Sequence, residues 1–107
     1  NLLHVCHSSC FLTELSSRPY PAKMINWNSF DPTNLPLDKA GRALPNHCHV
    51  GGVDHTGWLL RSTPDEIEYL IDKLKDEHSA DRLIIGPGCS IEPKTPKENL
   101  RAIRDHI

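Results

Sequence analysis

The chain has no long hydrophobic segment and no excess of charge of either sign. Its longest apolar runs span a few residues, far fewer than the roughly 20 that a membrane-spanning helix requires. The net charge is −2, so nothing favours binding to nucleic acid or to a membrane surface. Hydrophobic residues make up only 37% of the 107 residues, and this length fits one domain. We therefore expect one domain that contacts neither nucleic acid nor membrane.

Features of a secreted protein are also missing. Residues 1–6 contain no basic region, apolar stretch or small-residue cleavage site of a signal peptide. Four cysteines could form two disulfides in a secreted chain, but histidine stands next to or near three of them. We therefore favour a cytoplasmic protein with reduced thiols, some of them bound to a metal. The chain also starts without methionine, directly in an apolar run, and we expect it to be part of a longer protein.

Four short apolar runs alternate with polar turns and helical patterns. The runs are Leu2–Cys6, Ala22–Asn26, His47–Gly51 and Arg82–Gly86. Strands that alternate with helices predict βαβ units and a parallel sheet, so the fold class is α/β. The pattern alone leaves open whether the four units belong to a closed barrel or form a small open sheet.

Two helices have clear start signals. Thr63-Pro64-Asp65-Glu66 supplies an N-cap, a proline at the first helical position and a glutamate that can complete a capping box. Thr95-Pro96-Lys97-Glu98 repeats the device. Apolar residues at helical spacing follow each start: Ile67, Leu70, Ile71 and Leu74 after the first, and Leu100, Ile103 and Ile107 after the second. Shorter helices are predicted over 11–17 and 37–43.

The segment Gly86–Ala102 is the most specific in the chain. It resembles the closing motif of the uroporphyrinogen decarboxylase-like superfamily, a Gly-Cys or Gly-His turn and then Thr-Pro-x-Glu-Asn-Leu-x-Ala. Leu3-His4-Val5-Cys6 resembles the His-x-Cys strand of the methyltransferase branch of that superfamily. Three further segments follow the order of the family between these two ends: Asn26-Trp27, Gly51–Asp54 and Ser62–Glu66. The resemblance spans residues 1–107 and implies the C-terminal half of a TIM (β/α)₈ barrel, its strands five to eight.

The same resemblance implies a choice between two activities. In cobamide:thiol methyltransferases, His-x-Cys and a later cysteine bind zinc, and the matching residues here are His4, Cys6 and Cys89. Relatives that decarboxylate uroporphyrinogen carry histidine in the last turn and lack the His-x-Cys pair. The chain thus resembles the methyltransferase branch, which implies a methylated corrinoid (cobalamin) on a separate carrier protein and a small acceptor thiol such as coenzyme M. The alternatives are a tetrapyrrole decarboxylase and an inactive half-barrel that needs a partner chain.

The chemistry of the three residues fits this ligand set. His4 and Cys6 are two positions apart on a predicted strand, so their side chains leave the same face. Cys89 follows the last strand, at the end of a barrel where active sites lie. Three N/S ligands leave a fourth zinc position for a thiol, which zinc would hold as the thiolate. Two departures from the family are His7, where glycine is usual, and the additional Cys10.

Other residues are weaker candidates for binding substrate or metal. Asp54 and Trp27, close to the ends of predicted strands, are secondary candidates for binding substrate. On one strand, Cys48 would face away from His47 and His49, so these three are not expected to share a metal. Cys10 is expected in the core or on a helix face. The remaining histidines are expected at the surface or in loops: His7, His55, His78 and His106.

Half a barrel would leave apolar side chains uncovered. The inward faces of Leu3, Met24, Val50 and Ile84, or of their neighbours, would be exposed together with two unpaired strand edges. We therefore expect the chain to pair with an N-terminal half-barrel chain or to associate with itself.

Overall fold

The computed structural model describes residues 1–17, 22–78 and 82–107, which form one α/β unit. In this part of the chain, strands and helices alternate as the sequence predicts. The elements in order are β1 (Leu2–Val5), α1 (Leu12–Ser16), β2 (Met24–Trp27), α2 (Leu37–Ala43), β3 (Cys48–Val53), α3 (Trp58–Arg61), α4 (Pro64–Glu77), β4 (Leu83–Pro87) and α5 (Lys97–His106). None of these helices is long and apolar enough to cross a membrane.

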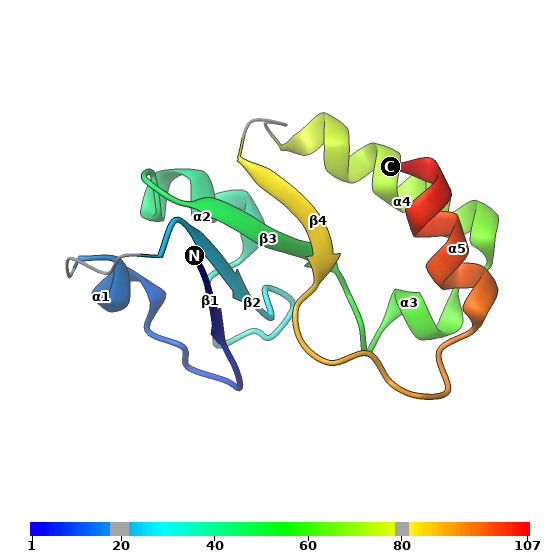
Figure 1. Ribbon diagram of the computed structural model, residues 1–107, viewed down its shortest axis with the longest axis horizontal. Helices are drawn as coiled ribbons and strands as arrows, with labels where there is room; N and C mark the ends of the chain where they lie inside the picture. Colours follow the sequence, from blue (N-terminus) through cyan, green and yellow to red (C-terminus); the bar gives the residue numbers. More distant parts are fainter. Residues whose placement is uncertain (18–21, 79–81) are drawn as a thin grey trace.

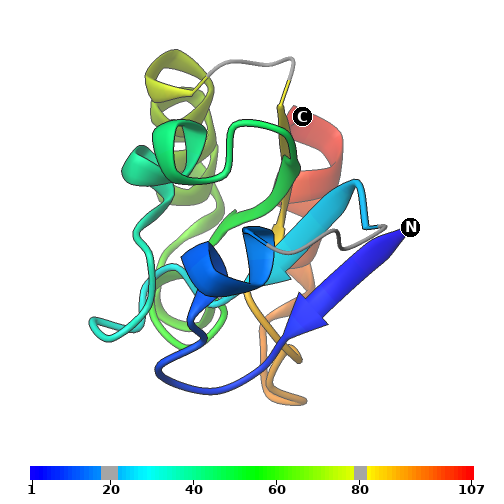
Figure 2. The same cartoon turned by 90° about the vertical axis from the view of Figure 1, so that its left-hand side faces the viewer.

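The four strands form one parallel sheet in the order β1-β2-β3-β4. Figure 1 shows them side by side in chain order, with α4 and α5 next to β4, and Figure 2 shows β1 along the free border of the sheet. Each strand returns to its neighbour through a helical connection, the plan of successive βα units in a barrel. The fold is therefore a partial (β/α) barrel, and the prediction of fold class is confirmed.

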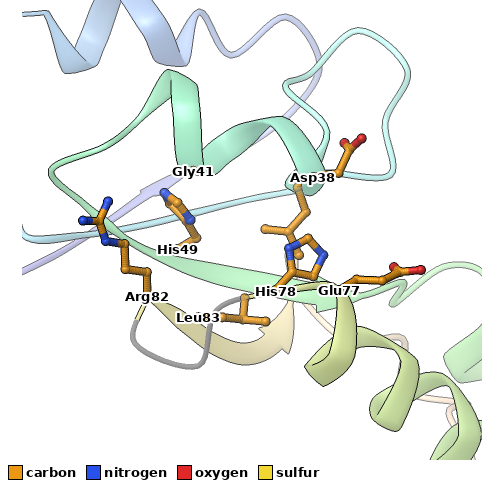
Figure 3. Close-up of a pocket in the computed structure, with 8 residues that line it drawn as sticks. Asp38, Gly41, His49, Glu77, His78, Arg82 and Leu83 are labelled. Atoms are coloured by element: carbon orange, nitrogen blue, oxygen red, sulfur yellow. The ribbon is translucent and has the colours of Figure 1, made fainter.

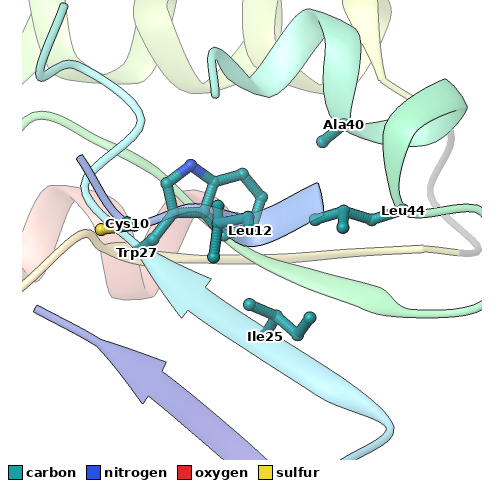
Figure 4. Packing of buried hydrophobic residues seen from close by; sticks show 6 residues of the cluster. All are labelled: Cys10, Leu12, Ile25, Trp27, Ala40 and Leu44. Carbon is teal, nitrogen blue, oxygen red and sulfur yellow. The ribbon is translucent and has the colours of Figure 1, made fainter. Parts of the chain in front are cut away.

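One face of the sheet packs against the helices. On this face Ile25 and Trp27 join residues of α1 and α2 in a first core cluster, shown in Figure 4: Cys10, Leu12, Ile25, Trp27, Ala40 and Leu44. Val53 anchors a second cluster beneath α3, α4 and α5: Val53, Leu59, Ile67, Ile71 and Ala102. Successive strand residues alternate between faces, so the next residue along each strand points away from these helices.

The other face is open in the described part of the chain. Register places His4 beside Asn26, Asn26 beside Val50, and Val50 beside Ile84, all on this face. Leu2 at 54% exposure and Ile84 at 45% remain accessible to solvent. At β1 the open position is taken by Leu2, the neighbour of Leu3, because Leu3 pairs with buried Ile25 on the helix-covered side.

The two predicted helix starts differ in the structure. Before α4 the capping box is complete, with the Thr63 amide donating to Glu66 Oε2 (2.8 Å) and the Glu66 amide to Thr63 Oγ1 (3.4 Å). The prediction of a capping box before α5 is wrong. Pro96 is the N-cap there, and the buried Thr95 hydroxyl has no partner among the described residues. The chain reaches helical geometry one residue later than the motif predicts, so Thr95 lies outside the helix start. Ile107, predicted on the apolar stripe of α5, is exposed at its end.

Candidate metal centre

His4, Cys6 and Cys89 converge at the carboxyl ends of the strands. His4 lies on β1, Cys6 directly follows β1, and Cys89 follows β4 by two residues. The Cys89 sulfur is 3.5 Å from Cys6 Sγ and 3.7 Å from His4 Nε2, and the three ligand atoms lie within 4.8 Å of one another. Among the described residues, this is the one group of three or more His, Cys, Asp or Glu side chains close enough to share a metal ion. The structure thus brings together residues 85 positions apart.

Gly88 allows the Cys89 turn to reach β1 from the far border of the sheet. A Cβ atom at Gly88 would lie 2.6 Å from Asn28 Cα and 3.0 Å from the Trp27 carbonyl oxygen, both backbone atoms. Only glycine lets the turn pass this close to the end of β2. The turn therefore crosses the carboxyl edge of the sheet and delivers Cys89 beside Cys6.

The loop after Cys6 is held in an unusual backbone conformation. His7, Ser9 and Phe11 have positive φ angles of 73°, 53° and 49°. Asn34 fixes the loop, because its side-chain oxygen accepts from the Cys10 amide and its side-chain nitrogen donates to the His7 carbonyl, both at 3.0 Å. The φ angle of His7 lies in the left-handed region that favours glycine, which gives a physical reason for the glycine usual at this position.

The two thiols of the site are not equivalent. The pKa of Cys89 is lowered, mainly by the backbone amide of Ser90 and then by hydrogen bonds with Cys6 and His4. The pKa of Cys6 is raised, mainly because its hydrogen bond to Cys89 stabilises the protonated form. Cys89 is therefore the first of the two sulfurs to become a thiolate, the form that binds metals.

The two secondary candidates lie outside this group. Trp27 is 1% exposed on the helix-covered face, and its indole nitrogen donates to the Leu35 carbonyl (2.7 Å). Asp54 directly follows β3, and its carboxylate accepts from the Gly57 amide (2.9 Å) and the Thr56 hydroxyl (3.3 Å). In this structure both side chains bind their own surroundings, and their contact with substrate stays a prediction.

The remaining cysteines and histidines are apart from the metal group. Cys10 is a core residue, as predicted, and its thiol donates to the His7 carbonyl at 3.0 Å. Cys48 and His49 point to opposite faces of β3, and His49 donates from Nε2 to the Leu44 carbonyl (3.1 Å). His55 lies in a loop but is buried rather than at the surface, and its Nδ1 has no hydrogen-bond partner in the described part of the chain.

A cavity of about 190 Å³ lies at the opposite end of the sheet (Figure 3). It is lined by His49 and Leu83, near the starts of β3 and β4, and by the charged side chains of Asp38 on α2 and Glu77 on α4. The lining residues are Leu37, Asp38, Gly41, His49, Glu77, His78, Arg82 and Leu83. This cavity is remote from Cys6 and Cys89, so it is not part of the metal group.

Sequence reasoning missed Asn26 as part of the site. Its side chain contacts the His4 ring, and its buried position on β2 is next to His4 in the sheet register. A polar residue inside an otherwise apolar strand is the signal that could have identified it, because a buried amide needs hydrogen-bond partners.

Comparison with known proteins agrees with this architecture. The family model described as Uroporphyrinogen decarboxylase (URO-D) matches residues 1–107. No curated protein matches the chain significantly. Because the family model covers every residue of the chain, from β1 through the Cys89 turn to α5, the chain belongs to the uroporphyrinogen decarboxylase family.

Proposed function

We propose that the protein is a zinc-dependent methyltransferase of the cobamide:thiol branch of this family. The observation that carries the proposal is the convergence of His4 Nε2, Cys6 Sγ and Cys89 Sγ within 4.8 Å. Its reaction would move a methyl group from a methylated corrinoid to a small thiol such as coenzyme M. The family match alone is equally compatible with decarboxylation of a tetrapyrrole, so the two thiols are the feature that favours methyl transfer.

The donor set fits zinc by type. One imidazole nitrogen and two thiolates are the ligands that zinc prefers, and three protein ligands are typical of zinc sites that keep a fourth position for substrate. His4 and Cys6 are exposed, so a substrate thiol can reach the group from solvent. Zinc bound there would hold that thiol as a thiolate at neutral pH.

The proposed methyl transfer is a nucleophilic displacement. The substrate thiol loses its proton to solvent, and its sulfur forms a bond to the methyl carbon. The carbon–cobalt bond of the corrinoid breaks, and its electron pair stays on cobalt. The products are a methyl thioether and a corrinoid reduced by two electrons at cobalt. His4, Cys6 and Cys89 would orient the attacking sulfur, and Asp54, which follows β3 at the same edge of the sheet, is the proposed contact for a polar group of the substrate.

The chain would act as part of a larger assembly. We assign residues 1–107 to strands five to eight of the barrel, so the first four strands would come from an N-terminal half-barrel chain or from self-association. A corrinoid carrier protein would present the methyl donor at the open carboxyl edge of the strands. Without such partners the half-barrel would be inactive.

An assay of methyl transfer from methylcobalamin to coenzyme M tests the proposal. The complementary half-barrel is added to the protein, and the change in corrinoid absorbance measures the reaction. We expect activity that is lost on chelation and restored by zinc, and lost by orders of magnitude in His4→Ala. Cys10→Ser should retain the activity, because this thiol belongs to the core. A metal-free preparation that decarboxylates uroporphyrinogen would instead support the second function.

A further inference from the structure

Asn26 lies at the centre of the carboxyl edge of the sheet. It is 9% exposed and makes three side-chain hydrogen bonds to three different strands. Its Nδ2 group donates to the carbonyl of Val50 (2.8 Å) and to the carbonyl of Pro87 (2.9 Å). Its Oδ1 faces Nδ1 of His4. One amide therefore connects β1, β3 and β4 through β2.

The hydrogen-bond chemistry determines the state of the His4 ring. Carbonyl oxygens accept but cannot donate, so both N–H groups of Asn26 are committed to Val50 and Pro87. This orientation leaves only the acceptor Oδ1 toward His4, and the ring must donate from Nδ1. A neutral imidazole that carries its proton on Nδ1 has a lone pair on Nε2. That nitrogen is the one that faces Cys89 Sγ at 3.7 Å.

The same amide also sets the position of Cys89. Pro87 precedes Cys89 by two residues, so the bond from Asn26 holds the start of the turn that carries this thiol. Gly88 between them permits the close approach to the end of β2. Asn26 thus contacts both His4 on β1 and the start of the Cys89 turn after β4, which come from opposite borders of the sheet.

We infer that Asn26 is a positioning residue that keeps His4 in the Nδ1–H tautomer and registers the Cys89 turn against it. Outer hydrogen bonds of this kind orient metal-binding histidines and raise metal affinity. The inference about metal affinity rests on the proposed zinc site, whereas the inference about the tautomer does not depend on any metal.

Asn99 provides a matched control for a purely structural role. It is also buried, and its Nδ2 donates to two carbonyls, of Leu59 and Ser62, both at 2.9 Å. Asn99→Leu and Asn26→Leu each remove two buried hydrogen bonds of the same type. Only the second variant removes the contact with His4.

The first measurement uses the unaltered, metal-free protein. Nitrogen-15 NMR of the histidine rings distinguishes an Nδ1–H ring from an Nε2–H ring, and His4→Gln identifies the His4 signals. We expect His4 as the Nδ1–H tautomer. A His4 ring protonated on Nε2 would overturn the inference, whether or not the protein binds zinc, and this result is independent of how any Asn26 variant folds.

The second measurement compares the parent protein with its variants in two properties. Zinc affinity is measured by competition with a chromophoric chelator, and the metal environment by the visible spectrum of the cobalt-substituted protein. Asn26→Leu should bind zinc about 10- to 100-fold more weakly and change the cobalt spectrum. Asn99→Leu should keep both properties. Asn26→Asp retains an acceptor for His4 and should keep the Nδ1–H tautomer. Equal affinity and spectra in Asn26→Leu and the parent would refute the positioning role, whereas a parent without zinc but with the Nδ1–H ring would refute only the zinc function.

Discussion

At the scale of single residues, the metal group depends on how closely the backbone of the Cys89 turn approaches the end of β2. Gly88 fits there because a side-chain carbon would collide with backbone atoms, which cannot rotate away. His7 and Asn34 perform the matching task on the other side, where a left-handed residue and a buried amide hold the loop after Cys6. The three candidate ligands are thus positioned by neighbours that are not themselves members of the metal group.

Gly88→Ala should therefore destabilise the protein and disrupt the metal group. Forcing atoms into a packed site costs about 1–3 kcal/mol, and the shift would move Cys89 away from His4. Denaturant unfolding and zinc content check both effects. Gly41→Ala is the control, because its new Cβ meets no atom within 4 Å inside α2, and it should stabilise the protein by about 0.5–1 kcal/mol. If Gly88→Ala retains full stability and full zinc content, the turn does not need glycine.

At the scale of helices and strands, packing is less uniform than the repeated sequence pattern predicts. His49 on β3 is 5% exposed, with its ring edge-on to Trp27 at a centroid distance of 6.0 Å. It donates to the Leu44 carbonyl just after α2, so this histidine joins the sheet to the helix layer. Burial lowers the pKa of His49, because the charged ring is poorly solvated there.

This histidine should make stability depend on pH. In the unfolded chain, histidine binds a proton near pH 6.5, whereas the folded protein keeps His49 neutral to lower pH. Below about pH 6.5 the unfolded state binds more protons, so the free energy of unfolding falls as pH decreases and is fully retained above that pH. Denaturant unfolding at pH 7.5 and pH 5.5 should show a larger loss in the parent than in His49→Leu. His7→Asn, which replaces an exposed histidine, should behave as the parent; identical losses in all three proteins would exclude this role of His49.

The alternation of elements could be predicted from the sequence, because apolar runs and the capping box at Thr63 are local signals. His4 and Cys6 could be placed together because strand geometry puts alternate residues on one face. The contacts of Asn26 could not be predicted, since they depend on the register among four strands and on the path of the Cys89 turn. The start of α5 also differed from the prediction, because Pro96 is the N-cap and the Thr95 hydroxyl is buried instead of capping the helix.

At the scale of the whole molecule, the sheet has helices on one face and accessible side chains on the other. Leu2, Met24, Val50 and Ile84 share the open face, and in the described part of the chain β1 and β4 form the sheet borders. In a complete barrel these inward side chains fill the centre, and neighbouring strands cover the edges. An open apolar face with free strand edges favours association with another half-barrel.

We therefore expect the isolated chain to associate at micromolar concentration, as measured by sedimentation or light scattering. Ile84→Lys should weaken association, because it places a charge on the open face. Tyr69→Lys alters a side chain on α4 that is more exposed than Ile84 (68% against 45%) but lies away from the sheet, and it should leave association unchanged. A monodisperse 12.0 kDa species with cooperative thermal unfolding would show that four units form a complete core.

Zinc content of protein purified under reducing conditions tests the central claim most directly. We expect about one zinc per chain in the parent, in Cys10→Ser and in Cys48→Ser, because neither of these thiols belongs to the metal group. Cys89→Ser should lose most of its zinc, since only His4 and Cys6 remain as ligands. Parent levels of zinc in Cys89→Ser, or loss of zinc in Cys10→Ser, would contradict the assignment of His4, Cys6 and Cys89 as the metal site.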